Sequence, residues 1–182
     1  MNADNWAMLY RCRWSNADAE RVVPQLAELL NSDNIQIANE ALRALFRIGT
    51  PAVSAAPEVV KLTQSRNPIT KQLSVLTLGQ IAHQVPSLCV GPLALALTDP
   101  ICCRDALRAL AFIGSEACEV LEHVKHLFND PNAKIRKAAL VTAAAIGGKD
   151  PEIVGFLRGA TGDRSKIVRE AASKCLQEVG NG

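Results

Sequence analysis

The feature that most constrains this chain is a repeat of about 33 residues. An apolar residue followed by glycine or alanine recurs five times, and successive second residues are separated by 33, 32, 33 and 33 residues. A period of this length is typical of repeat proteins, in which each unit buries its apolar face against the next. The five pairs are Ile48-Gly49, Ile81-Ala82, Ile113-Gly114, Ile146-Gly147 and Val179-Gly180.

Each repeat predicts a pair of helices. Apolar residues precede the pairs at helical spacing, and a glycine after the last one ends a helix because it adopts left-handed backbone angles easily. A shorter apolar helix comes first, and Asp-Pro pairs break the chain between the two. We therefore expect an all-α chain, 1–182, forming one domain of five hairpins near residues 17–49, 50–82, 83–114, 115–147 and 148–180.

Two rows of residues define the expected core. Eight residues before each repeat's last residue stands a small side chain, which lets helices approach closely, and four residues before it stands a side chain that is aliphatic in most repeats. The first row is Ala41, Ser74, Ala106, Ala139 and Ala172, and the second is Leu45, Leu78, Leu110, Ala143 and Leu176.

The fourth repeat carries the best family signal. Residues 127–131 read Leu-Phe-Asn-Asp-Pro, residues 135–139 read Ile-Arg-Lys-Ala-Ala, and Ile146-Gly147 follow. This pattern resembles HEAT repeats, in the short form also seen in the phycobilisome-lyase-like group, and the resemblance covers about residues 17–180. It implies a right-handed α-solenoid whose second helices line the concave side.

HEAT repeats commonly carry an aspartate in the hairpin turn and an arginine six residues later. Asp130/Arg136 and Asp163/Arg169 have this separation, whereas the first two repeats have Ser32/Ala38 and Ser65/Lys71, and Cys103 replaces the arginine of the third. The resemblance implies a structural ladder, for which we name Asp130, Arg136, Asp163, Arg169 and Lys71.

The charges divide between the two helices of each hairpin. The net charge is only +2, but the second helices carry eleven Lys/Arg against four Asp/Glu and the first helices carry four against nine. This predicts a basic concave face for a protein or peptide partner that is acidic, with nucleic acid as a weaker possibility. The alternative is a charged face that is merely solvated. The predicted partner-binding residues are Arg43, Arg47, Arg104, Arg108, Lys134, Lys137 and Lys174, interrupted by Glu40, Asp105 and Glu170.

Residues 1–16 are expected to form a capping helix. Trp6, Tyr10 and Trp14 are four residues apart and share one face of it. In one interpretation the helix packs these aromatic side chains as a lid on the first repeat, because solenoids need end caps. In the other, they line the end of the groove, and Trp14 joins the partner-binding residues.

Catalytic and metal chemistry find little support. No nucleophile or phosphate-loop motif occurs. Glu119, Glu122, His123 and His126 share one helix without a converging further ligand, and the neighbours Cys102 and Cys103 are best explained as small buried side chains. We expect no catalytic residue, no metal and no cofactor.

The expected function is a non-catalytic scaffold. The alternative is a HEAT-like enzyme or accessory, either a bilin-lyase-like chromophore binder or a DNA-alkylation-repeat-like nucleic-acid binder. The N-terminus has no basic start or long apolar run, no apolar stretch is long enough to span a membrane, and none of the six cysteines forms a CxxC pair. These features predict a cytoplasmic protein with reduced thiols and no membrane contact.

Overall fold

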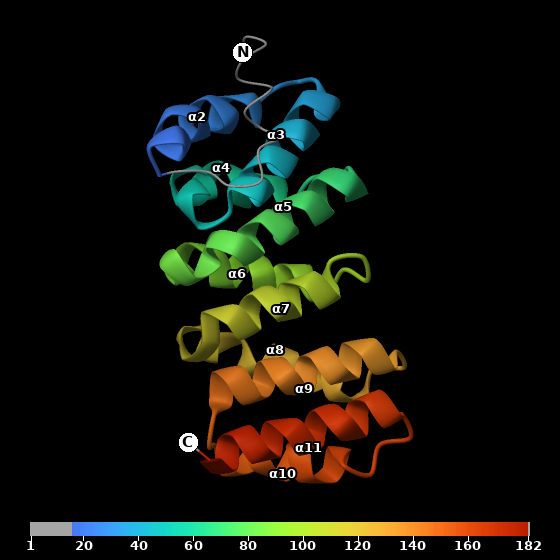
Figure 1. Cartoon of the computed structure of the whole chain (residues 1–182). Coiled ribbons are helices and arrows are strands. Elements are labelled where there is room, and N and C mark those ends of the chain that lie inside the picture. The colour runs from blue at the N-terminus through green and yellow to red at the C-terminus, as the bar shows by residue number, and fades with distance from the viewer. Residues whose placement is uncertain (1–15, 182) are drawn as a thin grey trace. The chain divides into compact units, whose positions relative to one another are not determined.

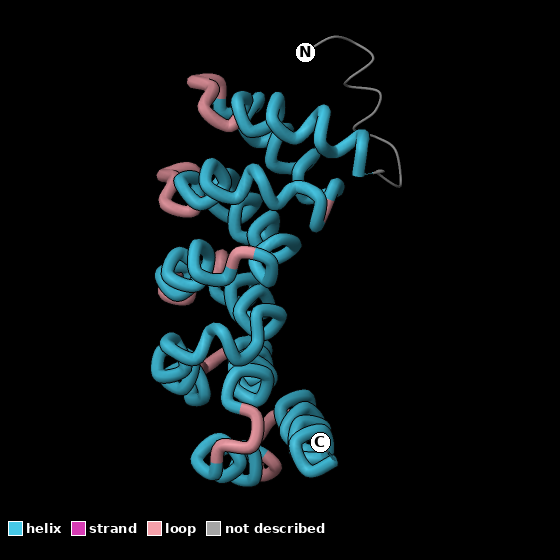
Figure 2. The backbone as a smooth tube through the Cα atoms, turned by 90° about the vertical axis from the view of Figure 1, so that its left-hand side faces the viewer, coloured by secondary structure: helices cyan, strands magenta, loops and turns pink. Residues whose placement is uncertain are grey.

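The computed structural model describes residues 16–181, and these residues form α-helices and 3-10 helices joined by short loops, with no strand among them (Figures 1 and 2). The chain divides between Pro92 and Leu93 into two compact units. The all-α prediction is confirmed. The predicted capping helix lies outside the described residues except for Asn16.

The first unit is built from helix pairs that bury their aliphatic faces against one another. Its largest buried side chains include Leu26, Leu42, Leu45 and Leu78. Each hairpin loop is short, as is usual for antiparallel helix neighbours. Its elements are α2 (Asn16–Leu29), α3 (Ile35–Ile48), η1 (Thr50–Ala55), α4 (Ala56–Leu62), α5 (Pro68–Ile81), η2 (Ala82–Gln84) and the start of α6 (Pro86–Ala96).

The second unit continues the same pattern. In this unit α10 and α11 lie side by side (Figures 1 and 2). Its core includes Leu107, Leu110, Ile153 and Leu157. Its elements are the end of α6, then α7 (Cys103–Ile113), η3 (Gly114–Val120), α8 (Leu121–His126), η4 (Leu127–Asn129), α9 (Ala133–Gly147), α10 (Pro151–Ala160) and α11 (Lys166–Asn181).

The predicted core rows are buried except at Leu176. Leu45, Leu78 and Leu110 are fully buried, and so are all five small residues of the other row, Ser74 included. The burial of Leu45, Leu78 and Leu110 was expected from their place four residues before each helix end, and it is confirmed. Leu176 is only partly buried.

The helix ends follow the predicted glycines only in part. Gly49 and Gly114 take the left-handed backbone angle, each with φ of 73°. In the fourth repeat Gly148, with φ of 52°, takes this angle instead of Gly147, which is the last residue of α9. A Cβ on Gly147 would lie 2.8 Å from Cγ1 of Ile153, so this glycine permits close packing of α10.

The turn between the two helices of a hairpin has the same local hydrogen bond in all five hairpins. A side-chain oxygen accepts from the backbone N–H two residues later, at 2.7–3.2 Å. Serine does this in the first two hairpins and aspartate in the others, because both side chains have an oxygen at the right reach. The acceptors are Ser32, Ser65, Asp99, Asp130 and Asp163.

Candidate partner-binding groove

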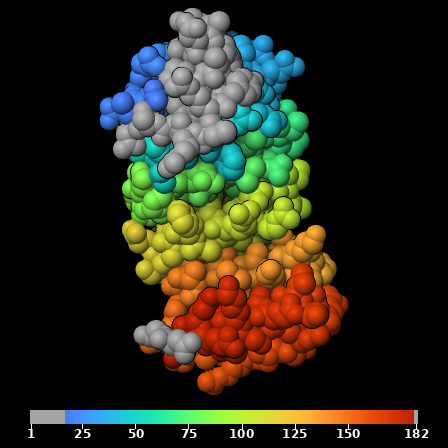
Figure 3. Space-filling view, viewed as in Figure 1, coloured from blue at the N-terminus to red at the C-terminus, as the bar shows by residue number. Residues whose placement is uncertain are grey.

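The second unit has a groove along α7 and α9, to which α11 contributes one residue. Its volume is about 640 Å³. Figure 3 views the face on which these helices lie, with α7 in yellow, α9 in orange and α11 in red. We call this site the α7–α9 groove, and it is lined by Arg104, Arg108, Ala111, Phe112, Lys134, Lys137, Ala138, Val141, Thr142 and Ile167.

Four of the predicted partner-binding residues lie together in this groove. Arg104 and Arg108 stand one turn apart on α7, and Lys134 and Lys137 stand on the first turns of α9. All four are exposed. Within residues 16–181 none of their side chains has an ion pair or a hydrogen bond.

The three acids that interrupt the cations in the sequence do not neutralise the groove. Asp105 is 7% exposed and does not line the groove. Glu40 pairs with Arg43 in the first unit, and Glu170 pairs with Lys166 on α11. Acidic side chains are thus absent from the lining of the α7–α9 groove.

The remaining predicted cations have other surroundings. Arg43 and Arg47 are exposed on α3, and Nε of Arg43 lies 3.4 Å from Glu40. Lys174 is exposed on α11 and pairs with Glu178 at 3.6 Å. None of these three lines the α7–α9 groove, and their continuity with it stays a prediction. Trp14 lies outside the described residues, as do Trp6 and Tyr10.

Three large apolar side chains also line the groove, which the charge pattern had not indicated, and we call them its apolar floor. Phe112 of α7 is 59% exposed, and Val141 of α9 and Ile167 of α11 are each 39% exposed. Large apolar side chains that share an exposed, basic-rimmed surface are typical of binding sites. The available sequence signal was position within the repeat. Phe112, Val141 and Ile167 stand two, six and thirteen residues before their repeat's last residue, at places that the predicted cations hold in other repeats.

One ion pair of the predicted ladder connects two neighbouring hairpins. Arg136, buried on α9, donates from Nε to Oδ2 of Asp163 at 2.9 Å and from Nη2 to Oδ1 at 2.7 Å. Its Nη1 donates to the carbonyl oxygens of Asp130 and Pro131 in its own turn. The Arg136 hydrogen bonds lower the pKa of the Asp163 carboxyl to about 2.

The other ladder positions vary. Nη1 of Arg169 donates to the carbonyl oxygen of Asp163 at 2.8 Å, as Arg136 does to Asp130. Lys71 is half-buried on α5. Cys103 is buried where an arginine would stand, and burial, with a smaller effect of the Asp130 charge, raises the pKa of its thiol to about 11. These contacts are compatible with the expected structural role of the ladder.

Two threonines make hydrogen bonds between hairpins that the sequence analysis does not predict. Oγ1 of Thr142 donates to the carbonyl oxygen of Leu107 at 2.8 Å, and Oγ1 of Thr77 donates to that of Leu42 at 3.2 Å. Both threonines are buried and stand five residues before their repeat's last residue. The sequence signal that could have revealed this contact is a polar residue at the same core-facing position in two repeats.

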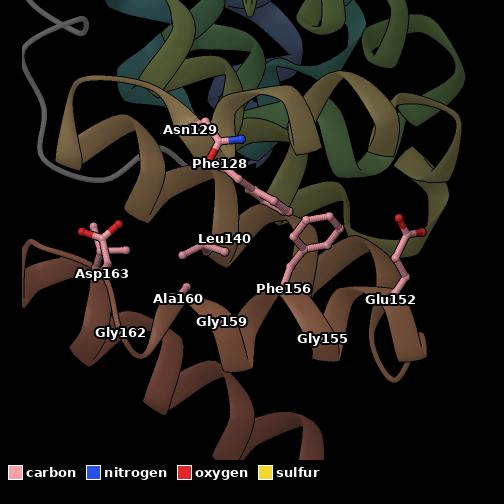
Figure 4. Close-up of a pocket in the computed structure, with 11 residues that line it drawn as sticks. Phe128, Asn129, Leu140, Glu152, Gly155, Phe156, Gly159, Ala160, Gly162 and Asp163 are labelled. Carbon is pink, nitrogen blue, oxygen red and sulfur yellow. The ribbon is translucent and has the colours of Figure 1, made fainter.

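A second cavity is lined mainly by η4, α10 and the loop that follows α10, and it has a volume of about 630 Å³ (Figure 4). Phe128 and Phe156 face each other in it, with ring centroids 5.0 Å apart, and Glu152 and Asp163 stand at opposite ends. Both carboxylates are already paired, Glu152 with Lys125 and Asp163 with Arg136. This cavity therefore offers no free charge to define a ligand.

Residues 16–181 contain no group of three or more His, Cys, Asp or Glu side chains arranged to hold a metal ion. No helix in that range is long and apolar enough to cross a membrane. The described cysteines are free thiols, and Cys102, Cys103, Cys89 and Cys175 are buried.

No protein-family model matches the sequence, and no curated protein matches it either. Solved structures do match. An engineered protein has a TM-score of 0.75 at 20% identity, over 97% of this chain and 89% of that chain. A designed armadillo repeat protein has a TM-score of 0.73 at 16% identity, over 96% and 91%. Another, in complex with the peptide (KR)4, has a TM-score of 0.76 at 18% identity, over 92% and 87%. The chain therefore has the fold of a helical repeat solenoid protein.

Proposed function

We propose that this protein is a non-catalytic scaffold that binds an acidic segment of a partner protein in the α7–α9 groove. The observation that carries the proposal is the set of four exposed cations, Arg104, Arg108, Lys134 and Lys137, none of which has a counter-charge within the described residues. Clustered like charges repel one another, and an acidic ligand relieves that repulsion.

The similar structures support the mode of binding but not the charge. A designed armadillo repeat protein of the same fold holds the peptide (KR)4, a basic ligand. In the present chain the groove is itself basic, so electrostatic complementarity selects the opposite peptide. We also propose that the repeats are HEAT repeats, on the basis of Asp130/Arg136 and Asp163/Arg169. We further propose a cytoplasmic location in which the thiols stay reduced.

The test measures binding of a fluorescein-labelled (DE)4 peptide by anisotropy, with labelled (KR)4 as the peptide of opposite charge. We expect (DE)4 to bind and (KR)4 not to bind. The affinity for (DE)4 is expected to fall as salt is raised, because ions screen exposed charges over about 8 Å at physiological ionic strength.

A pair of double variants assigns the site. Arg104→Glu with Arg108→Glu is expected to weaken (DE)4 binding at least tenfold. Lys149→Glu with Arg158→Glu changes the net charge equally, at two exposed residues that do not line the groove, and is expected to leave binding within about twofold. An equal effect of both pairs would contradict the proposed site.

A labelled single-stranded oligonucleotide completes the test. Phosphates also bind arginine and lysine, so tight oligonucleotide binding that the Arg104/Arg108 reversal abolishes, without (DE)4 binding, would replace the peptide proposal by a nucleic-acid one. Binding of (DE)4 alone supports the proposal.

A further inference from the structure

The α7–α9 groove contains apolar side chains as well as charged ones. Its rim is cationic, but Phe112, Val141 and Ile167 expose apolar surface inside it from three different helices. A purely acidic ligand would leave the exposed apolar surface of these side chains uncovered. Burial of apolar surface is the main favourable contribution to most association, so a well-matched ligand covers them.

The spacing along α7 defines how the ligand's side chains are arranged. Arg104, Arg108 and Phe112 follow one another at intervals of four residues on the same helix face. Each interval corresponds to about 6 Å along the helix axis, at 1.5 Å per residue. In an extended peptide, alternate side chains point the same way and are about 6.6–6.8 Å apart. The two spacings nearly match over three positions.

Resting on the proposed function, we infer that the ligand of the α7–α9 groove is an extended peptide with two acidic residues and one bulky apolar residue at alternate positions. The acidic side chains pair with Arg104 and Arg108, and the apolar side chain sits against Phe112 and Val141. Lys134 and Lys137 of α9 line the same groove and add to the attraction.

The experiment uses the full chain and three labelled peptides of equal length. The first has Glu at positions 2 and 4 and Leu at position 6, separated by Gly. The second has Ser in place of Leu. The third has the same residues as the first, but Leu is moved to position 3, between the two Glu, so that it points to the opposite side. We expect the first to bind at least tenfold more tightly than the second and about fivefold more tightly than the third.

A double-mutant comparison ties the gain to the groove floor. Phe112→Ala is expected to lower the affinity for the Leu peptide to within about twofold of the Ser peptide, while leaving the Ser peptide unchanged. Phe112 is 59% exposed, so the fold is not expected to depend on it, which circular dichroism melts check. Phe156→Ala, on α10 and 42% exposed, is the matched control and is expected to change neither peptide's affinity.

The outcomes separate this inference from the proposed function. Equal binding of the Leu and Ser peptides, both abolished by Arg104→Glu with Arg108→Glu, overturns the apolar position and leaves an acidic-peptide scaffold. Equal binding of the first and third peptides overturns the alternate spacing. Failure of every acidic peptide to bind overturns both the proposed function and the inference.

Discussion

Arg136 and Asp163 stand 27 residues apart in the chain and form an ion pair with two parallel hydrogen bonds, of 2.9 and 2.7 Å, that connects one hairpin to the next. The arginine side chain is 5% exposed and the aspartate 15%. Because Arg136 also donates to the carbonyl oxygens of Asp130 and Pro131, it joins two successive turns through one guanidinium group.

Replacing Asp163 tests the strength of this connection. Asp163→Asn keeps an oxygen for the N–H of Ser165 but leaves the buried Arg136 charge without a counter-charge, so we expect a loss of about 2–3 kcal/mol in the free energy of unfolding. Urea unfolding measures it. The control, Lys166→Gln, removes an exposed pair at 3.6 Å and is expected to cost less than about 1 kcal/mol. Equal losses would contradict the ladder role.

The same pair predicts a pH dependence of stability. The pKa of Asp163 is lowered from 3.8 to about 2 in the folded protein, chiefly by the hydrogen bonds from Arg136. The unfolded chain therefore takes up the proton first, and the stabilisation by Asp163 is present above about pH 4 and lost as the pH falls towards 2. The difference in stability between wild type and Asp163→Asn should shrink over this interval. A difference that stays constant from pH 5 to pH 2 would count against it.

Two glycines of the second unit, Gly147 and Gly155, should respond oppositely to alanine. Gly147→Ala places a Cβ 2.8 Å from Cγ1 of the buried Ile153, so we expect a loss of about 1–3 kcal/mol. Gly155→Ala, inside α10 with no atom within 4 Å of the new Cβ, is expected to gain up to about 1 kcal/mol from higher helix propensity. Thermal melts of both variants decide, and a gain for Gly147→Ala would show that α10 shifts freely.

Thr142→Val tests the hydrogen bond between α9 and α7. Valine keeps the shape of the side chain but removes the hydroxyl that donates to Leu107 and Ala138, and we expect a loss of about 1 kcal/mol. Thr161→Val removes an exposed hydroxyl that bonds only within its own turn, so its effect is expected to stay within about 0.5 kcal/mol. If both cost the same in denaturant unfolding, the bond between hairpins contributes nothing specific.

Leu110→Ala tests the core. Leu110 is fully buried, and its truncation is expected to cost about 2–5 kcal/mol through lost burial and the cavity left behind. Leu95, which is 61% exposed, provides the comparison, because Leu95→Ala is expected to cost less than about 0.5 kcal/mol. A loss below about 1 kcal/mol for Leu110→Ala would refute the register of the core row.

The sequence by itself determined the helical hairpins and their core rows. Helix periodicity, the Asp-Pro breaks and the positions of Leu45, Leu78 and Leu110 depend on residues within one repeat, and such local patterns are readable in a single chain. The turns between the two helices of each hairpin are also predictable from the sequence. Ser32 and Ser65 depart from the aspartate pattern but make the same hydrogen bond, since only an oxygen at that reach is needed.

Only the tertiary structure decided which charges remain available for a ligand. The sequence predicts seven partner-binding cations without ranking them. Arg43 and Lys174 pair with nearby glutamates. Four others line a groove with an apolar floor and have no counter-charge in the described part of the chain; these are Arg104, Arg108, Lys134 and Lys137. The partner of Arg136, the close approach at Gly147 and the exposure of Phe112 likewise depend on how one hairpin is offset against the next. That offset is set by packing between residues about 30 positions apart, which periodicity within one repeat does not encode.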